Sequence, residues 1–398
     1  MAKYIGPARR VEEIKEYYFS KKLKEIAKMQ AEGADIISLG IGGPDRMPPA
    51  EAIEALCGAV KRPDVHSYQS YVGLPELRNA YSDWYLSKYG VTLNPETQIL
   101  PLIGSKEGIL HISLAFLNPG DGVLVPDPGY PTYSSVSKLV GAEIFRYSLK
   151  PENDWQPDFD ELESFPLDNI KLMWINYPHM PTGARARKDV FERLIEFAGK
   201  HNIVIAHDNP YSFILNPEPL SFLQFEGAME IAVELNSLSK SHNMAGWRFG
   251  MIASNPEYIS WIMKVKSNID SGQFKPMMLA ATEALKVGED WYGEINREYA
   301  ERRKIAGEIM DALNCVYDPL QVGLFLWGRI PEQAESSETF ADSILYNHHV
   351  FLTPGSIFGS RGARYIRISL CAPIPRLREA LSRITSSPTP RSPLAPHP

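Results

Sequence analysis

Between residues 95 and 254 the sequence alternates short apolar runs with longer segments of helical periodicity. The apolar runs are rich in β-branched residues and end at Gly, Pro, Asp or Asn, which favour turns. Runs such as IVIA, residues 203–206, are apolar throughout, as expected of strands buried on both faces of a sheet. The predicted strands are 99–103, 122–126, 143–148, 171–176, 203–207, 231–235 and 249–253.

The helical segments between these strands imply right-handed crossovers, and therefore a mainly parallel sheet with helices on both faces. The strand 249–253 follows its predecessor without a full crossover helix, so it is expected to be an antiparallel member. We therefore predict a three-layer α/β domain.

Beyond about residue 276 the pattern changes to a long helical region at 278–314, strands at 322–328 and 365–370, and a helix at 339–347. This order is typical of a smaller α+β domain. The predicted organisation is an N-terminal arm (1–45) joining the small domain, a large domain (46–276), a small C-terminal domain (277–384) and a disordered Pro/Ser-rich tail (385–398).

Composition excludes several classes of protein. The net charge of -7 and the lack of a basic cluster argue against nucleic-acid binding and against an anionic membrane surface. No apolar run is long enough to span a bilayer, and the acidic residues among 10–29 argue against a transit peptide. Cys57, Cys315 and Cys371 are too far apart for a disulfide framework or a metal site, so a reducing cytoplasm is expected.

The segment SLSKSHNMAGWRFG, residues 237–250, combines a lysine, hydroxyl side chains and an arginine after an apolar strand. A lone lysine is ordinarily a solvated surface charge. A buried lysine near another cation has a lowered pKa, which suits Lys240 to form a Schiff base with a carbonyl group. The residues placed to bind a phosphate are Ser237, Ser239 and Arg248.

Two further segments place polar groups at the ends of predicted strands. In AHDNPYSF, residues 206–213, Asp208 ends a strand, although an Asp there is also typical of a helix N-cap. In IGSKEGIL, residues 103–110, a Gly-Ser turn leads into a helix, whose exposed N–H groups and positive end form a cradle for phosphate. This second segment implicates Gly104, Ser105 and Lys106.

In order and spacing these motifs resemble those of the pyridoxal-phosphate-dependent aminotransferases of fold type I, class I and II, the aspartate-aminotransferase-like superfamily. The resemblance covers residues 35–370, roughly, and implies the same α/β fold with a smaller second domain. It implies that Lys240 carries pyridoxal 5'-phosphate as a Schiff base. It also implies that Asp208 pairs with the protonated pyridine nitrogen and that Tyr211 hydrogen-bonds the phenolic oxygen of the cofactor.

The resemblance adds two tyrosines around the cofactor. In DPGYPTY, residues 127–133, Tyr130 matches the aromatic residue that stacks on the cofactor ring; a turn tyrosine packed on the surface is the alternative. In SYQSYVGLPELRNA, residues 67–80, Tyr68 matches the tyrosine that reaches the cofactor phosphate of the neighbouring subunit. The implied protein is a homodimer with shared active sites.

For the substrate, the resemblance implicates Arg367 in RYIRISL as the residue that binds the α-carboxylate, with Arg364 as its competitor. Gly42 in SLGIGGPD is expected to close over the same group through its backbone, although a simple tight turn is the alternative there. Tyr17 is a further expected contact on the substrate side.

One segment departs from the family pattern. In NYPHMPTG, residues 176–183, Met180 stands where the family has Asn immediately before Pro-Thr-Gly. A thioether cannot donate the hydrogen bond that this amide gives to the phenolic oxygen of the cofactor. Asn176 or His179 is expected to replace it, and Asn176 is therefore counted among the cofactor-binding candidates.

The predicted reaction moves an amino group between an L-amino acid and a 2-oxo acid by a ping-pong Schiff-base mechanism, without a metal. The alternatives are a C–S lyase or synthase on the same fold, and a ligand-sensing module of a DNA-binding regulator. No arginine occurs between residues 255 and 290, although Lys266 and Lys275 do, which favours a neutral amino donor over a dicarboxylic one. The chain also resembles diaminopimelate aminotransferases, so that substrate stays open.

Overall fold

The structure is a computed structural model that describes residues 6–12 and 18–386. Its largest sheet has seven strands in the order β2-β8-β7-β6-β5-β3-β4. All neighbours from β4 to β7 pair in parallel, whereas β8 pairs antiparallel with both β7 and β2. These strands are β2 (Ile99–Leu102), β3 (Gly122–Asp127), β4 (Glu143–Ser148), β5 (Ile170–Ile175), β6 (Val204–Asp208), β7 (Ala232–Ser237) and β8 (Gly250–Ser254). The α/β fold class and the antiparallel last strand are confirmed.

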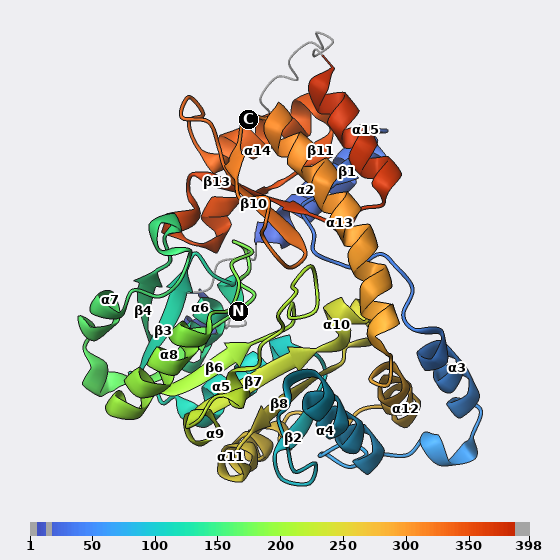
Figure 1. Cartoon of the computed structure of the whole chain (residues 1–398), viewed down its shortest axis with the longest axis vertical. Coiled ribbons are helices and arrows are strands. Elements are labelled where there is room, and N and C mark those ends of the chain that lie inside the picture. The colour runs from blue at the N-terminus through green and yellow to red at the C-terminus, as the bar shows by residue number, and fades with distance from the viewer. Residues whose placement is uncertain (1–5, 13–17, 387–398) are drawn as a thin grey trace, which may run out of the picture.

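Helices cover both faces of this sheet, as Figure 1 shows. Successive strand residues point to opposite faces. Leu172 and Trp174 therefore pack with the helices of one face, and Met173 and Ile175 with those of the other. The first face carries α5 (Ser105–Phe116), α6 (Pro131–Val140) and α11 (Pro256–Lys266); the second carries α4 (Pro75–Tyr89) and α8 (Lys188–His201).

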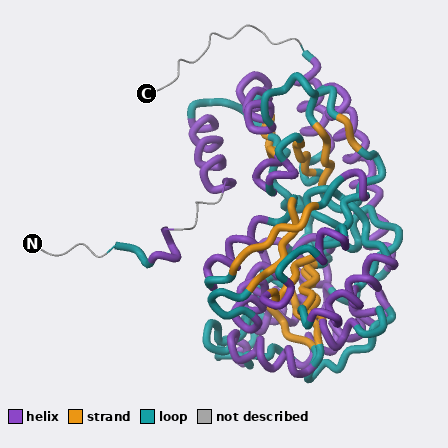
Figure 2. The backbone as a smooth tube through the Cα atoms, turned by 90° about the vertical axis from the view of Figure 1, so that its left-hand side faces the viewer, coloured by secondary structure: helices purple, strands orange, loops and turns teal. Residues whose placement is uncertain are grey.

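The second sheet lies in the C-terminal part and is antiparallel, in the order β12-β13-β10-β9. Its strands are β9 (Val316–Tyr317), β10 (Phe325–Arg329), β12 (Thr353–Pro354) and β13 (Tyr365–Ser369). The helices of this part are α13 (Glu289–Ala312), α14 (Ser337–His348) and α15 (Ile374–Thr385). Figure 2 shows the two groups of strands one above the other.

The helical region predicted at 278–314 is divided into two helices. The first is α12 (Lys275–Ala284), and α13 begins after Gly288, which is its N-cap residue. Since α12 packs on α4 and on α3 (Ala50–Ala59), we propose that the boundary between the domains falls at 285–288 rather than at 276/277.

The N-terminal segment reaches the C-terminal part through β1 (Ile37–Ser38), which pairs in parallel with β11 (Val350–Phe351). Ahead of it, α2 (Tyr18–Ala31) buries Phe19 and Ile26 against Phe351 and Leu345. Most of the predicted tail, from residue 387 on, lies outside the described residues. The remaining short helices are α1 (Arg9–Glu12), α7 (Phe159–Glu163), α9 (Ala228–Ile231) and α10 (Leu238–Ser241). Among the described helices, none has the length and apolar character needed to cross a membrane.

Candidate active site

A cavity of about 360 Å³ lies at the carboxyl ends of β5, β6 and β7, where residues of β10 and β13 close over them. Parallel strands place the groups that follow them at one edge of the sheet, which is where α/β proteins bind ligands. The sequence-predicted residues that line the cavity are Gly42, Ser105, Lys106, Tyr130, Asn176, Asp208, Tyr211, Ser237, Ser239, Lys240, Arg248 and Arg367. Lining residues that sequence reasoning missed include Phe19, Ile41, Tyr133, Phe325 and Phe358.

Lys240 reaches the cavity from α10, which begins immediately after β7. Ser237 caps this helix, and its hydroxyl accepts a hydrogen bond from the backbone N–H of Ser239 at 3.1 Å. The Lys240 Nζ atom donates to the carbonyl oxygen of Gly42 at 2.5 Å. Burial lowers the pKa of Lys240, and the positive charges of Arg367 and Arg248 lower it further. At a given pH, a larger fraction of the molecules therefore carries Lys240 as the neutral amine, which is the nucleophilic form.

Asp208 ends β6 with one carboxylate oxygen satisfied and the other not. Its Oδ2 atom accepts from the hydroxyl of Tyr133 at 2.8 Å, whereas its buried Oδ1 atom has no partner among the described residues. Burial raises the pKa of Asp208 to about 6, against the lowering effect of the Tyr133 hydrogen bond. A buried acceptor without a partner is costly, so this oxygen is suited to a ligand that donates a proton or carries a positive charge.

Tyr133 is held in place by a parallel stack on Trp174, with ring centroids 4.9 Å apart and planes 6° apart. Tyr130 lies one helical turn earlier and contacts the Tyr133 ring edge-on at 5.5 Å. The sequence offered one signal for Tyr133. It is the second tyrosine of DPGYPTY and follows Tyr130 by three residues, and residues three apart share a helix face.

Asn176 lies at the cavity, and the structure places His179 elsewhere. The Asn176 amide donates to the carbonyl oxygen of Asp208 at 2.6 Å, and its own oxygen accepts from the backbone N–H of Met180 at 2.8 Å. His179 is buried outside the cavity lining against Thr182, with 2.8 Å between its Nδ1 atom and the Thr182 hydroxyl. Burial lowers the pKa of His179 to about 3. Of the two expected substitutes for the missing amide, Asn176 is therefore the one in reach of a ligand.

The turn before α5 and the residue Arg248 form a cationic corner of the cavity. Gly104 has a φ of 82°, and a Cβ atom there would overlap the Arg248 guanidinium, so the close approach requires glycine. Arg248 Nη1 also donates to the carbonyl oxygen of Ala245 at 2.9 Å. With Lys106, the N-terminus of α5 and the Ser237 and Ser239 hydroxyls nearby, this corner is suited to a phosphate.

Arg367 projects from β13 into the opposite side of the cavity and is 4% exposed. Its guanidinium lies 3.8 Å from the ring centroid of Phe325 and donates to the Met180 sulfur at 3.2 Å. Arg364 instead donates to backbone carbonyls, those of Ala334 at 2.6 Å and Pro331 at 2.7 Å, outside the cavity lining. Arg367 is thus the arginine placed to bind a carboxylate.

If Arg367 binds the α-carboxylate of an amino donor, as the family resemblance implies, Arg367→Ala should weaken that binding by roughly 2–5 kcal/mol, because it removes one partner of a buried, charge-assisted contact. The loss should appear as a raised KM for the amino donor in half-reaction kinetics. Arg364→Ala is the matched control and should change thermal stability without changing that KM. An unchanged KM in Arg367→Ala would rule out the role.

Among the described residues, two predicted site residues, Tyr68 and Gly104, do not line the cavity. Tyr68 lies in the loop before α4, is 92% exposed and does not line the cavity. Tyr17 lies outside the described residues. Gly104 does not line the cavity itself but contacts Arg248, which does.

The arrangement fits a ligand that carries an aldehyde, a basic ring nitrogen and a phosphate. Lys240 would supply the amine for the aldehyde, the unsatisfied Asp208 oxygen would hold the ring nitrogen, and the corner around Arg248 would hold the phosphate. These are the three recognition groups of pyridoxal 5'-phosphate.

Comparison with known proteins adds independent observations. The family model for aminotransferase class I and II matches residues 34–384. An LL-diaminopimelate aminotransferase of Dehalococcoides mccartyi is 41% identical over 95% of this chain and 98% of its own. One of Nitratidesulfovibrio vulgaris is 42% identical over 93% and 96%. The structure of substrate-bound BacF from Bacillus subtilis superimposes with a TM-score of 0.92 at 35% identity, covering 96% of this chain and 98% of that one.

Proposed function

The chain belongs to the class I and II aminotransferase family, and because two of its relatives are named LL-diaminopimelate aminotransferases, we propose that its amino donor is LL-diaminopimelate. It is a pyridoxal-phosphate-dependent aminotransferase that works on amino acids and 2-oxo acids. The relatives are named as aminotransferases, so amino transfer is the activity, in place of the β-elimination, synthase and sensor alternatives.

We propose a division of labour among the cavity residues. Bound pyridoxal phosphate supplies a carbonyl group and an electron sink. Lys240 would hold the cofactor at that carbonyl, and as the free amine its Nζ would take up the proton of the substrate α-carbon. Asp208 Oδ1 holds a proton at the ring nitrogen, and Arg367 orients the α-carboxylate of the substrate. The convergence of these three side chains in one cavity is the observation that carries the proposal.

The remaining predicted residues complete the proposed cofactor site. Tyr130, Asn176 and Tyr211 line the same cavity. We assign Tyr130 to stacking on the cofactor ring, and Asn176 and Tyr211 to hydrogen bonds with its phenolic oxygen. The residues proposed to bind the phosphate are Gly104, Ser105, Lys106, Ser237, Ser239 and Arg248. We assign Gly42 to the part of the cavity that would hold the amino-acid substrate. Its carbonyl oxygen accepts a hydrogen bond from Lys240.

The choice of donor is supported by two relatives of this name that are 41% and 42% identical over nearly the full chain. Diaminopimelate carries a second amino-acid group whose charges cancel. It therefore agrees with the lack of arginine between residues 255 and 290, where a donor whose second carboxylate has no neighbouring ammonium group would call for one. A neutral aromatic donor is the competitor, because Phe19, Phe325 and Phe358 line the cavity.

The donor is tested with purified holoenzyme, 2-oxoglutarate and a panel of LL-diaminopimelate, L-phenylalanine, L-alanine and L-aspartate, with glutamate formation as the readout. We expect kcat/KM for LL-diaminopimelate to exceed the others by at least about tenfold, or 1.4 kcal/mol. A higher value for phenylalanine or alanine would contradict the proposed donor and leave amino transfer itself intact.

We also propose a homodimer whose active sites are completed across the interface. The support is the exposure of Tyr68, at 92%, and of two further aromatic residues: Tyr71, three residues later, at 45%, and Phe274, whose ring lies against His66, at 43%. Solvent exposure of such rings is typical of surfaces that bind another protein. We propose a reducing cytoplasm as the location, in keeping with the free thiols of Cys57, Cys315 and Cys371.

A further inference from the structure

A histidine and a glutamate form a fully buried pair on the face of the large sheet opposite to that of Asp208. His207 directly precedes Asp208 on β6, so its ring points to the other face. It lies beside Glu234 of β7 in the register of the sheet, with 2.8 Å between His207 Nδ1 and Glu234 Oε2. Both side chains are 0% exposed. The reaction described above uses neither residue.

Four donors converge on the Glu234 carboxylate. The hydroxyls of Tyr85 and Ser221 donate to Oε1, each at 2.8 Å. The backbone N–H of Phe222 donates to Oε2 at 2.7 Å, beside His207. Two donors on each oxygen satisfy an ionised carboxylate completely. His207 supplies one of these donors from the neighbouring strand.

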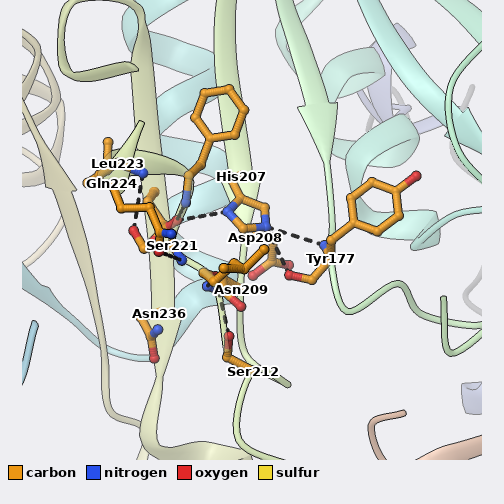
Figure 3. A network of polar contacts seen from close by, with 12 residues as sticks. Tyr177, His207, Asp208, Asn209, Ser212, Ser221, Leu223, Gln224 and Asn236 are labelled. Atoms are coloured by element: carbon orange, nitrogen blue, oxygen red, sulfur yellow. Dashed lines mark hydrogen bonds and ion pairs between the residues drawn. The ribbon is translucent and has the colours of Figure 1, made fainter. Parts of the chain in front are cut away.

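The second nitrogen of His207 contacts the backbone of Tyr177, as Figure 3 shows. The backbone N–H of Tyr177 donates to Nε2 at 3.3 Å, and the carbonyl oxygen of Tyr177 lies 3.0 Å from the same atom. With Nδ1 against Glu234, the ring joins that carboxylate to the main chain of Tyr177.

Tyr177 belongs to the loop that supplies Asn176 and Met180 to the active-site cavity. Asn176 is itself joined to the carbonyl oxygen of Asp208 at 2.6 Å and to the Met180 backbone at 2.8 Å. The loop is thus bound by two consecutive residues of β6, by the side chain of His207 and by the backbone carbonyl of Asp208.

We propose that His207 is a positioning residue that is anchored by Glu234, binds the main chain at Tyr177 and so fixes Asn176 and Met180 against the cofactor. This rests on the proposed cofactor site. His207 also acts on its neighbour Asp208: burial raises the pKa of that carboxyl to about 6, and the hydrogen bond from Tyr133 and the presence of His207 oppose the rise.

The proposal is tested on the binding of pyridoxal phosphate itself, without turnover. This readout does not depend on which amino acid is the donor, so it separates this inference from the proposed substrate.

The positioning role is tested by two charge variants, Glu234→Gln and the double variant His207→Gln/Glu234→Gln. The first removes the carboxylate that anchors His207, and the second removes the anchor and the imidazole ring together. Tyr85→Phe is the matched control, because it removes a hydrogen bond to the same carboxylate and leaves His207 and Glu234 in place. The readouts are the Kd of apoenzyme for pyridoxal phosphate, by quenching of tryptophan fluorescence, and the circular dichroism of the bound cofactor.

We expect the Kd to rise by about tenfold or more in both charge variants and the cofactor dichroism to weaken, while Tyr85→Phe loses thermal stability but keeps the parental Kd and dichroism. Parental values in the charge variants would overturn the proposal. So would an equal change in Tyr85→Phe, since the effect would then come from general loosening of the buried cluster.

Discussion

Replacing Lys240 with alanine should abolish turnover and leave the fold intact. The variant loses the amine that binds the cofactor carbonyl, and it also loses the base that moves the α-proton. General acid–base catalysis alone contributes about 10²–10⁴-fold, so the combined loss should exceed that range. The change should cost little stability, because the buried amine is already disfavoured as a cation and its pKa is lowered by burial.

The measurement is glutamate formation with a saturating donor, together with thermal unfolding of the apoenzyme. Lys106→Ala provides the comparison within the same cavity. It should weaken cofactor binding but retain measurable turnover when pyridoxal phosphate is in excess. Near-normal turnover in Lys240→Ala would show that another group does this chemistry.

Replacing Asp208 with asparagine should slow removal of the α-proton by about 10²–10³-fold, the usual effect of losing one fixed electrostatic group at the reacting centre. Asparagine has no negative charge to keep the ring nitrogen protonated. Single-turnover kinetics with an α-deuterated donor isolate this step. Tyr133→Phe, which removes only the hydrogen bond to Oδ2, should have a smaller effect. A normal rate in Asp208→Asn would refute the pairing.

The same variant has a second consequence, for the apoenzyme. Burial raises the pKa of Asp208 to about 6, above its unfolded value, so the protonated carboxyl favours folding and the carboxylate opposes it. This contribution is fully present below about pH 4 and is lost as the pH rises through about 6. Apo Asp208→Asn should therefore have a higher Tm than the parent at pH 8. The difference should vanish near pH 4.

The large sheet was predictable because each strand is a distinct apolar run with turn residues after it. Lys240 and Asp208 could be placed at its edge because parallel strands present their carboxyl ends together. The two-residue strands β1, β9, β11 and β12 were missed, because so few residues carry no periodicity. The break between α12 and α13 was also missed: it falls at Gly288, and glycine can end a helix or lie within one.

Residues whose positions depend on tertiary contacts could not be predicted from the sequence. Phe325 and Phe358 reach the cavity only because the second sheet closes over the first, and apolar residues of this kind look the same as core. The pairing of His207 with Glu234 depends on β6 and β7 being neighbours in this register. No sequence motif indicates that register. The role proposed for Tyr68 requires a second chain, so neither the sequence nor a single protomer can place it.

The covalent site can be identified by reducing the holoenzyme with sodium borohydride, digesting it and locating the pyridoxyl phosphate label by peptide mass spectrometry. Reduction converts the bond between lysine and cofactor into a stable secondary amine. We predict one labelled peptide per chain, carrying the modification on Lys240 of the SLSKSHNMAGWR segment. A label on Lys106 or on any other lysine, or no label on an enzyme that is active and contains cofactor, would contradict the assignment of Lys240.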